Sequence, residues 1–138
     1  MLQHQHIQNL QPVIASSWFT IDPRTFVYAS VQQISDAEKH LMITRDGIEI
    51  TIVTDVNNFP LAGGCVVNKE KWKLVNIRCG NPFYCIGFIA FITGSLANAG
   101  IDIVLVSSFS NDLVLVMEKD MDQAVHILKE IGFKELAG

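Results

Sequence analysis

The segment from Cys85 to Ala99 limits the fold of this chain more than any other part of its sequence. Its length and composition predict a helix that stops at Gly100. Apolar residues lie on nearly every face of that helix: Ile86, Phe88, Ile89, Phe91, Ile92 and Leu96. The surrounding apolar run, Phe83 to Leu96, is shorter than the roughly 20 residues that span a bilayer. We therefore expect a helix that is covered on more than one side inside a soluble domain.

The segments on either side of this helix predict a sheet. Trp72 to Cys79 reads as a strand before the helix, and Ile101–Phe109 and Leu113–Met117 read as a hairpin after it. Asp120 and Gln123 then form a capping-box pattern at the start of a last helix. The helical crossover can place the first two strands parallel, with the third antiparallel between them. The expected architecture is an α+β sandwich with helices on one face of a mostly antiparallel sheet.

The first half of the chain predicts strands with a weaker helical signal. Phe26–Val31 reads as a strand, and the Asp-Gly pair at 46–47 predicts a hairpin turn between residues 41–44 and 48–53. Alternation places Ile48, Ile50 and Ile52 on the face of the second hairpin strand that meets the core. Residues 2–14 fit one weak amphipathic helix, broken near Pro12, which would supply the helix of this half. The turn-rich stretch 57–64 marks a boundary, and the two halves look like a decayed duplication.

Composition and charge exclude several classes of protein. The 138 residues suffice for one domain or two small ones sharing a core, and 49% of them are hydrophobic. The formal net charge of -4 does not suit a general nucleic-acid binder, and a polybasic segment for a membrane surface is absent. An odd count of three cysteines favours a reducing compartment. The N-terminal residues do not resemble a signal peptide, so we expect a cytoplasmic protein without nucleic-acid or membrane partners.

Residues 87–103 and 107–116 resemble an ACT domain. The shared pattern is a glycine followed by an apolar helix, Ala-Gly-Ile at the end of that helix, a strand, and an aspartate that opens the next strand. The chain is similar to small bacterial proteins made of two ACT-like halves and to the CASTOR-type amino-acid sensors. The resemblance implies a ferredoxin-like ACT fold with two such halves. A degenerate N-terminal half would span residues 1–64, and a C-terminal ACT domain residues 65–138.

The resemblance also implies a regulatory function in which a small effector, an amino acid above all, is bound non-catalytically. The implied binding residues are Asn81, Pro82, Phe83, Tyr84, Cys85, Ile86, Gly87, Phe88 and Asp112, and Ser107 and Ser108 can add hydroxyl groups to the site. Backbone N–H groups at the start of the helix can hold a carboxylate. A carboxylate side chain such as Asp112 can accept hydrogen bonds from an ammonium group.

Each of these residues also has a structural interpretation. Gly87 can serve tight packing of helix on sheet, and Asn111-Asp112 is also ordinary turn chemistry. The hydroxyl groups of Ser107 and Ser108 can satisfy neighbouring backbone groups. A buried, inert thiol is the simpler interpretation of Cys85, because no histidine lies near it in the sequence.

The sequence predicts no catalytic residues, metal site or cofactor. It holds no P-loop, dinucleotide glycine motif, Ser-His-Asp arrangement or paired catalytic carboxylates. The spacing of the three cysteines does not suit zinc, and His4 and His6 do not share a helix face. We therefore expect a sensor domain that is not an enzyme and whose partner is a small-molecule effector. The alternative is a ligand-free structural or interaction protein that forms a homodimer.

Overall fold

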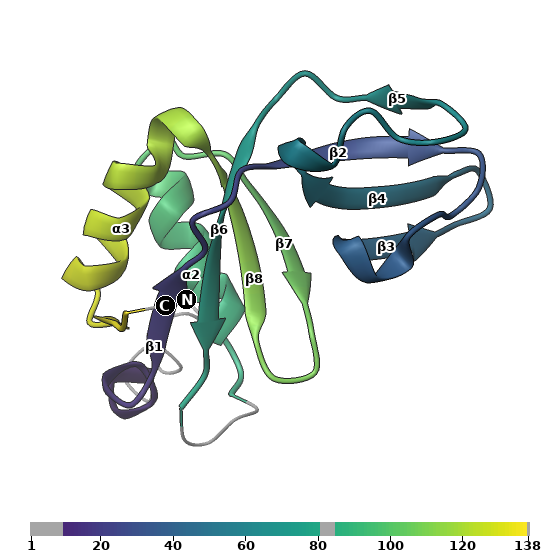
Figure 1. The fold of residues 1–138 in the computed structure, drawn as a ribbon. Coiled ribbons are helices and arrows are strands. Elements are labelled where there is room, and N and C mark those ends of the chain that lie inside the picture. Colours follow the sequence, from purple (N-terminus) through teal and green to yellow (C-terminus); the bar gives the residue numbers. More distant parts are fainter. Residues whose placement is uncertain (1–9, 81–84, 138) are drawn as a thin grey trace.

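The computed structural model describes residues 10–80 and 85–137 of the chain, which form two lobes. The elements are β1 (Trp18–Ile21), β2 (Phe26–Val31), β3 (His40–Arg45), β4 (Ile50–Asp55), β5 (Cys65–Val67), β6 (Trp72–Arg78), α2 (Phe88–Asn98), β7 (Ile103–Ser107), β8 (Asp112–Met117), α3 (Met121–Glu130) and β9 (Lys134–Glu135). Short 3-10 turns lie at Ala37–Lys39, Val56–Asn58 and Glu118–Asp120. Strands β2 to β5 and the first two 3-10 turns form the N-terminal lobe, residues 26–67, and the remaining elements form the C-terminal lobe (Figure 1).

The C-terminal lobe is an α+β sandwich, as predicted. Its strands lie in the order β7-β8-β6-β1-β9, with α2 and α3 together on one face (Figure 1). Strand β8 is antiparallel to both β6 and β7, so β6 and β7 run parallel on either side of it, as the crossover predicted. None of the helices in the described ranges is long and apolar enough to cross a membrane.

An N-terminal segment completes this lobe, which the sequence did not predict. Strand β1 pairs antiparallel with β6 over its full length, from Trp18 opposite Arg78 to Ile21 opposite Val75. Before it, residues 10–15 are helical and continue through Pro12, so the expected break there is wrong. This helical segment buries Leu10, Val13 and Ile14 in the core of the C-terminal lobe. The expectation that it supplies a helix to the first half is therefore also wrong.

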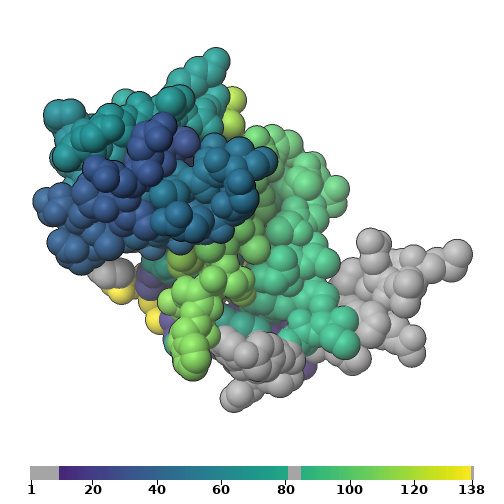
Figure 2. Space-filling view, turned by 90° about the vertical axis from the view of Figure 1, so that its right-hand side faces the viewer, coloured from purple at the N-terminus to yellow at the C-terminus, as the bar shows by residue number. Residues whose placement is uncertain are grey.

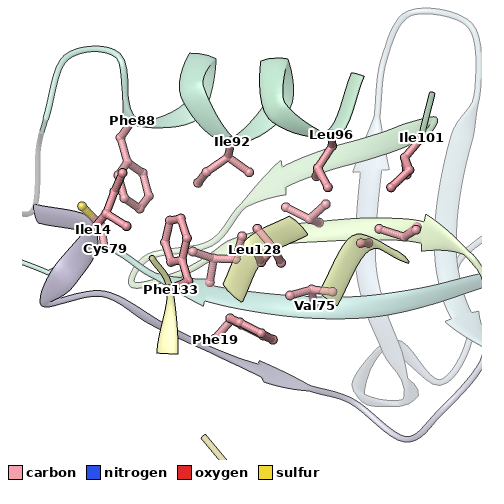
Figure 3. Packing of buried hydrophobic residues seen from close by; sticks show 14 of the residues in the cluster. Ile14, Phe19, Val75, Cys79, Phe88, Ile92, Leu96, Ile101, Leu128 and Phe133 are labelled. Carbon is pink, nitrogen blue, oxygen red and sulfur yellow. The ribbon is translucent and has the colours of Figure 1, made fainter. Parts of the chain in front are cut away.

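The main core lies between the sheet and the helices. In Figure 3, Phe88, Ile92 and Leu96 point from α2 toward the sheet, and all three are buried. They recur every four residues, while Ile89 and Phe91 are only partly buried beside them. Helix α2 is therefore covered on one broad stripe, which corrects the expectation of cover on more than one side. The Phe88 and Phe133 rings meet edge to face, with centroids 5.7 Å apart.

The N-terminal lobe is a four-stranded sheet in the order β3-β4-β2-β5. The Asp46 carboxylate accepts hydrogen bonds from the N–H groups of Ile48 and Glu49, over 2.7 and 2.8 Å, and closes the predicted hairpin. Ile50 and Ile52 are buried as predicted, but Ile48 is 92% exposed. The reason is that β4 begins at Ile50, so Ile48 lies in the turn, outside the alternation of the strand.

The two lobes meet through a second buried group of side chains, the interlobe cluster. Its members are Phe26, Val53, Trp72, Leu74, Leu113 and Leu115. A single register pair, Phe26 opposite Trp72, joins the strands of the two lobes into one continuous sheet. The division of the chain at residues 64 and 65 remains a prediction. Strand pairing crosses that point, because β1 pairs with β6 and β5 pairs with β2.

Candidate functional site

A cavity of about 270 Å³ opens where the end of β6, the start of α2 and the β7–β8 turn come together. It is lined by Cys79, Cys85, Phe88, Ile89, Ser107, Ser108, Phe109, Asn111 and Asp112. The tip of the β7–β8 hairpin, which carries part of this lining, projects from the surface beside the N-terminal lobe (Figure 2). Three separate stretches of sequence thus form one site on the C-terminal lobe.

The structure brings several of the predicted residues to this cavity. Cys85, Phe88, Ser107, Ser108 and Asp112 all line it. The two predicted residues Ile86 and Gly87 lie at the start of α2 but outside the lining, and the Ile86 side chain is 78% exposed. Asn81, Pro82, Phe83 and Tyr84 lie outside the described residues. A binding role for any of these residues remains a prediction.

The sequence analysis missed four lining residues: Cys79, Ile89, Phe109 and Asn111. Cys79 follows the last residue of β6, and Ile89 is the second residue of α2. The Ser-Phe-Ser-Asn run at 108–111 signals a turn, but nothing in the sequence shows that this turn closes over the helix start.

The β7–β8 turn supplies the polar wall of the cavity. Ser107 Oγ donates a hydrogen bond to Asp112 Oδ1 over 2.7 Å. The turn itself is closed by the Ser108 N–H, which donates to the Asn111 carbonyl over 2.8 Å, and by the Asn111 N–H, which donates to Ser108 Oγ over 3.3 Å. The structural interpretation of Ser108 and Asn111 as turn chemistry is therefore correct, whereas the Ser107 hydroxyl bonds to a side chain and not to a backbone group. The same turn also holds the Asp112 carboxylate at the cavity.

The start of α2 forms the opposite wall. Gly87 precedes the helix with a φ of 88°, a left-handed conformation that favours glycine. Within the described chain, no side chain caps this helix, and no acidic residue lies in its first turn. The Phe91 N–H bonds back to the Gly87 carbonyl over 2.9 Å, which begins the regular helical pattern. Among the described residues, the positive end of the helix dipole is thus left without a side-chain cap or an acidic residue of its own first turn.

Two thiols line the cavity in different states of burial. Cys79 is 7% exposed and belongs to the main core, whereas Cys85 is half-buried. Burial, and to a smaller extent the electrostatic interactions with Cys85 and Asp112 nearby, raises the pKa of the Cys79 thiol to about 11. Cys79 is therefore a neutral thiol at physiological pH, and Asp112 supplies the carboxyl group among the described lining residues.

Strand β6 is held in place at the cavity by the N-terminal segment. The buried Ser17 Oγ donates to the Val13 carbonyl over 2.6 Å and accepts the Gly80 N–H over 2.8 Å. A Cβ added at Gly80 would lie 2.0 Å from Ser16 Oγ and 2.7 Å from the Ser16 backbone. This close approach requires glycine after Cys79, so residues far from the cavity in the sequence fix one of its walls.

The described residues do not form a ligand set for a metal ion. No group of three or more His, Cys, Asp or Glu side chains in residues 10–80 and 85–137 could hold a metal ion. The cavity lining instead combines one carboxylate, hydroxyl groups, thiols and apolar rings. Such a surface suits a small molecule with a polar end and an apolar body.

Comparison with known proteins finds a family match over residues that lie mainly in the C-terminal lobe. The sequence model of the ACT domain family matches residues 67–130, so the resemblance inferred from the sequence is confirmed over this region. The α+β architecture with a ferredoxin-like ACT fold is likewise confirmed. No curated protein sequence matches the chain significantly.

Three solved structures share the fold over most of this chain. A Vibrio cholerae protein described as a possible transport protein of unknown function has a TM-score of 0.79 at 18% identity, and the match covers 92% of this chain and 98% of that one. An Agobacterium tumefaciens protein has a TM-score of 0.73 at 22% identity, with 88% and 93% covered. The ligand-free regulatory subunit of aspartate kinase from Thermus thermophilus has a TM-score of 0.61 at 12% identity, with 85% and 97% covered.

Proposed function

We propose that this chain, whose residues 67–130 are an ACT domain, is a non-catalytic regulatory module that binds an amino acid in the cavity between β6, α2 and the β7–β8 turn. ACT domains are in general small-molecule regulatory domains, and the structural neighbours include a regulatory subunit of aspartate kinase. The observation that carries the proposal is the cavity itself, which gathers Cys85, Phe88, Ser107, Ser108 and Asp112 at one place.

The size of the cavity favours a small effector. Its volume of about 270 Å³ lies just below the usual range for sites that hold drug-sized ligands, roughly 300–1,000 Å³. A single amino acid suits such a volume better than a nucleotide or a dinucleotide cofactor. We therefore expect an effector of about the size of a single amino acid.

The charges around the cavity suggest how such a zwitterion would lie. Asp112 uses Oδ1 for its bond with Ser107, and Oδ2 makes no hydrogen bond with a described residue, which leaves it for an ammonium group. The uncapped start of α2 offers backbone N–H groups and a positive dipole end for a carboxylate. Phe88, Ile89 and Phe109 would then contact an apolar side chain of the effector.

A thermal-shift panel of the common amino acids at millimolar concentration tests this proposal. We expect one or a few amino acids with uncharged side chains to raise the melting temperature of the full chain. The D112N variant should keep its unliganded melting temperature and lose the shift. Asp102→Asn is the matched control, because Asp102 is exposed and lies outside the cavity lining. If no amino acid stabilises the wild-type chain, or if D112N responds as the wild type does, the proposed site is wrong.

One observation favours the alternative of a ligand-free homodimer. Phe109 is 98% exposed at the tip of the β7–β8 turn, and Ile86 is 78% exposed near the start of α2. Exposed apolar side chains on neighbouring segments are typical of contact surfaces. Light scattering over a range of concentrations tests this. A dimer that Phe109→Ser dissociates, and that Val66→Ser on the N-terminal lobe leaves intact, would support the alternative, and a monomer at all concentrations would exclude it.

A further inference from the structure

The interlobe cluster buries two polar groups without hydrogen-bond partners among the described residues. These are the Tyr28 hydroxyl on β2 and the Trp72 indole N–H at the start of β6. The two rings meet edge to face, with centroids 6.2 Å apart, so one group comes from each lobe. Trp72 is only 5% exposed, and burial raises the pKa of the Tyr28 hydroxyl. Both groups would regain hydrogen bonds from water if the lobes separated.

The backbone connections between the lobes are few. Two segments join them, residues 22–25 and 68–71. On the C-terminal side, the Asp22 N–H still bonds to the Leu74 carbonyl over 3.0 Å. On the N-terminal side, the Asn68 N–H still bonds to the Tyr28 carbonyl over 2.9 Å. Between these points, separation of the lobes would break one register pair of the sheet, Phe26 with Trp72.

The first connecting segment is a compact turn with its own internal support. Arg24 forms an ion pair with Asp22 over 2.7 Å, and its guanidinium group lies 4.9 Å from the centre of the Phe26 ring. The Lys73 ammonium group donates to the Pro23 carbonyl over 2.9 Å. The Arg24–Asp22 pair involves no member of the interlobe cluster, whereas the ring contact reaches Phe26, which belongs to that cluster. The Arg24–Asp22 pair can therefore persist while the lobes change their relative position.

We propose that the N-terminal lobe, residues 26–67, detaches as a unit from the face of the C-terminal sheet opposite the helices, pivoting at residues 22–25 and 68–71. The docked state is held by burial of the interlobe cluster, and the unpaired hydroxyl of Tyr28 and indole N–H of Trp72 oppose it. The detached state exposes Leu74, Leu113 and Leu115 while the main core stays closed. The protein is therefore a two-state device whose moving part is the N-terminal lobe.

Native-state thiol labelling tests this directly on the full chain. Leu115 faces the interlobe cluster, and its neighbour Val114 on the same strand faces the main core. With Cys65 and Cys85 replaced by Ser and Cys79 by Ala, the variants L115C and V114C report opening on the two sides of one strand. We expect L115C to react with an aromatic disulfide reagent at least about ten times faster than V114C under native conditions, since local opening needs less free energy than global unfolding.

A second substitution tests the role of the unpaired hydroxyl. Tyr28→Phe removes a group that prefers the detached state, so it should slow labelling of L115C by about five-fold or more. The substitution should leave unchanged the ratio of the V114C labelling rate to the rate of global unfolding. Ser30→Ala is the control, because Ser30 lies on the same strand and its hydroxyl already has a partner, Glu49, 3.3 Å away.

The possible results of these experiments distinguish a lobe that detaches from one that stays docked. Equal labelling rates for L115C and V114C, or no effect of Tyr28→Phe, would overturn the proposal. If either cysteine variant fails to fold, acrylamide quenching of Trp72 in a Trp18→Phe background gives the same test. Trp72 should then be quenched more than a fully buried indole, and less after Tyr28→Phe. All of these measurements use the effector-free protein, so they do not depend on the proposed amino-acid site.

Discussion

At the scale of single residues, two glycines of the C-terminal lobe show how local space determines tolerance to substitution. A Cβ at Gly80 would lie 2.0 Å from Ser16 Oγ and 2.7 Å from the Ser16 backbone, so the neighbouring chain would have to move. A Cβ at Gly94, within α2, meets nothing within 4 Å. The first glycine serves a close approach of two segments, and the second weakens a helix without serving one.

We therefore predict opposite effects for two identical substitutions. Gly80→Ala should destabilise the protein by about 1–3 kcal/mol, the usual cost of forcing atoms into a packed site. Gly94→Ala should stabilise it by about 0.5–1 kcal/mol, because alanine loses less conformational entropy than glycine in a helix. Urea unfolding of the two variants measures both effects. No loss of stability in Gly80→Ala would contradict the packing described at Gly80, and a loss in Gly94→Ala would contradict the open space described at Gly94.

The Cys79 thiol gives the stability a pH dependence of known sign. Its pKa of about 11 in the folded protein exceeds the ordinary value of 9.0. Between these two values the unfolded chain releases a proton that the folded protein retains, so stability decreases as the pH rises. Cys79→Ala should flatten this decrease between pH 9.0 and about 11. Tyr28, whose pKa is also raised, acts with the same sign in both proteins and cancels in the comparison. Identical pH profiles would show that Cys79 does not titrate as described.

At the scale of elements, local patterns predicted β6, β7, β8 and the two helices α2 and α3, because each carries a clear period of its own. Strand β1 was missed because it has four residues and is stabilised by β6, far away in the sequence. The predicted capping box at the start of α3 is also wrong. Asp120 makes no side-chain cap, and Gln123 instead donates to the Ala99 carbonyl at the end of α2, over 3.5 Å. Tertiary contacts thus determine the structure of these two segments, which short local sequence patterns did not predict.

The sequence likewise predicted one part of the candidate site and missed another. Resemblance to a family gave the lining residues that lie near the helix start and the β7–β8 turn, including Phe88 and Asp112. Cys79 and Phe109 could be assigned to the cavity only once the fold brought the end of β6 and the hairpin tip together. Spacing along the chain does not record that proximity.

The link between the N-terminal segment and β6 is testable at this scale. Ser17→Ala leaves the Gly80 N–H without its partner, and we expect it to destabilise the protein by about 1–3 kcal/mol. Ser95→Ala on α2 is the matched control, because its hydroxyl donates only to the Phe91 carbonyl of its own helix over 2.7 Å. Denaturant unfolding measures the free energy of unfolding of both variants. A loss no greater for Ser17→Ala than for Ser95→Ala would show that β1 does not depend on this contact.

At the scale of the whole molecule, the cavity and the interlobe cluster share the same two strands. On β8, Asp112 faces the cavity and Leu113 faces the cluster. On β7, Ser107 faces the cavity and Val106 packs against the cluster. A molecule that holds the β7–β8 hairpin at its cavity side therefore also restrains the surface on which the N-terminal lobe docks.

This arrangement predicts a reciprocal effect, which rests on both proposals. An amino acid that raises the melting temperature should slow thiol labelling of L115C and leave that of V114C in proportion to global stability. By linkage, Tyr28→Phe should increase the affinity for that amino acid in proportion to the increase in the docked fraction of the unliganded protein. Calorimetric titration of the Tyr28→Phe and Ser30→Ala variants measures this change in affinity. Equal affinities, together with unchanged labelling, would show that the cavity and the lobe act independently.

The most direct measurement for the central claim is a nuclear magnetic resonance titration of the isotope-labelled full chain with the amino acids that stabilise it. The account predicts that backbone amide signals of Phe88, Ile89, Ser107, Ser108 and Asp112 shift first and saturate together, and that D112N abolishes these shifts. Saturable shifts confined to residues away from the β7–β8 turn and the start of α2, or none with any amino acid, would contradict it.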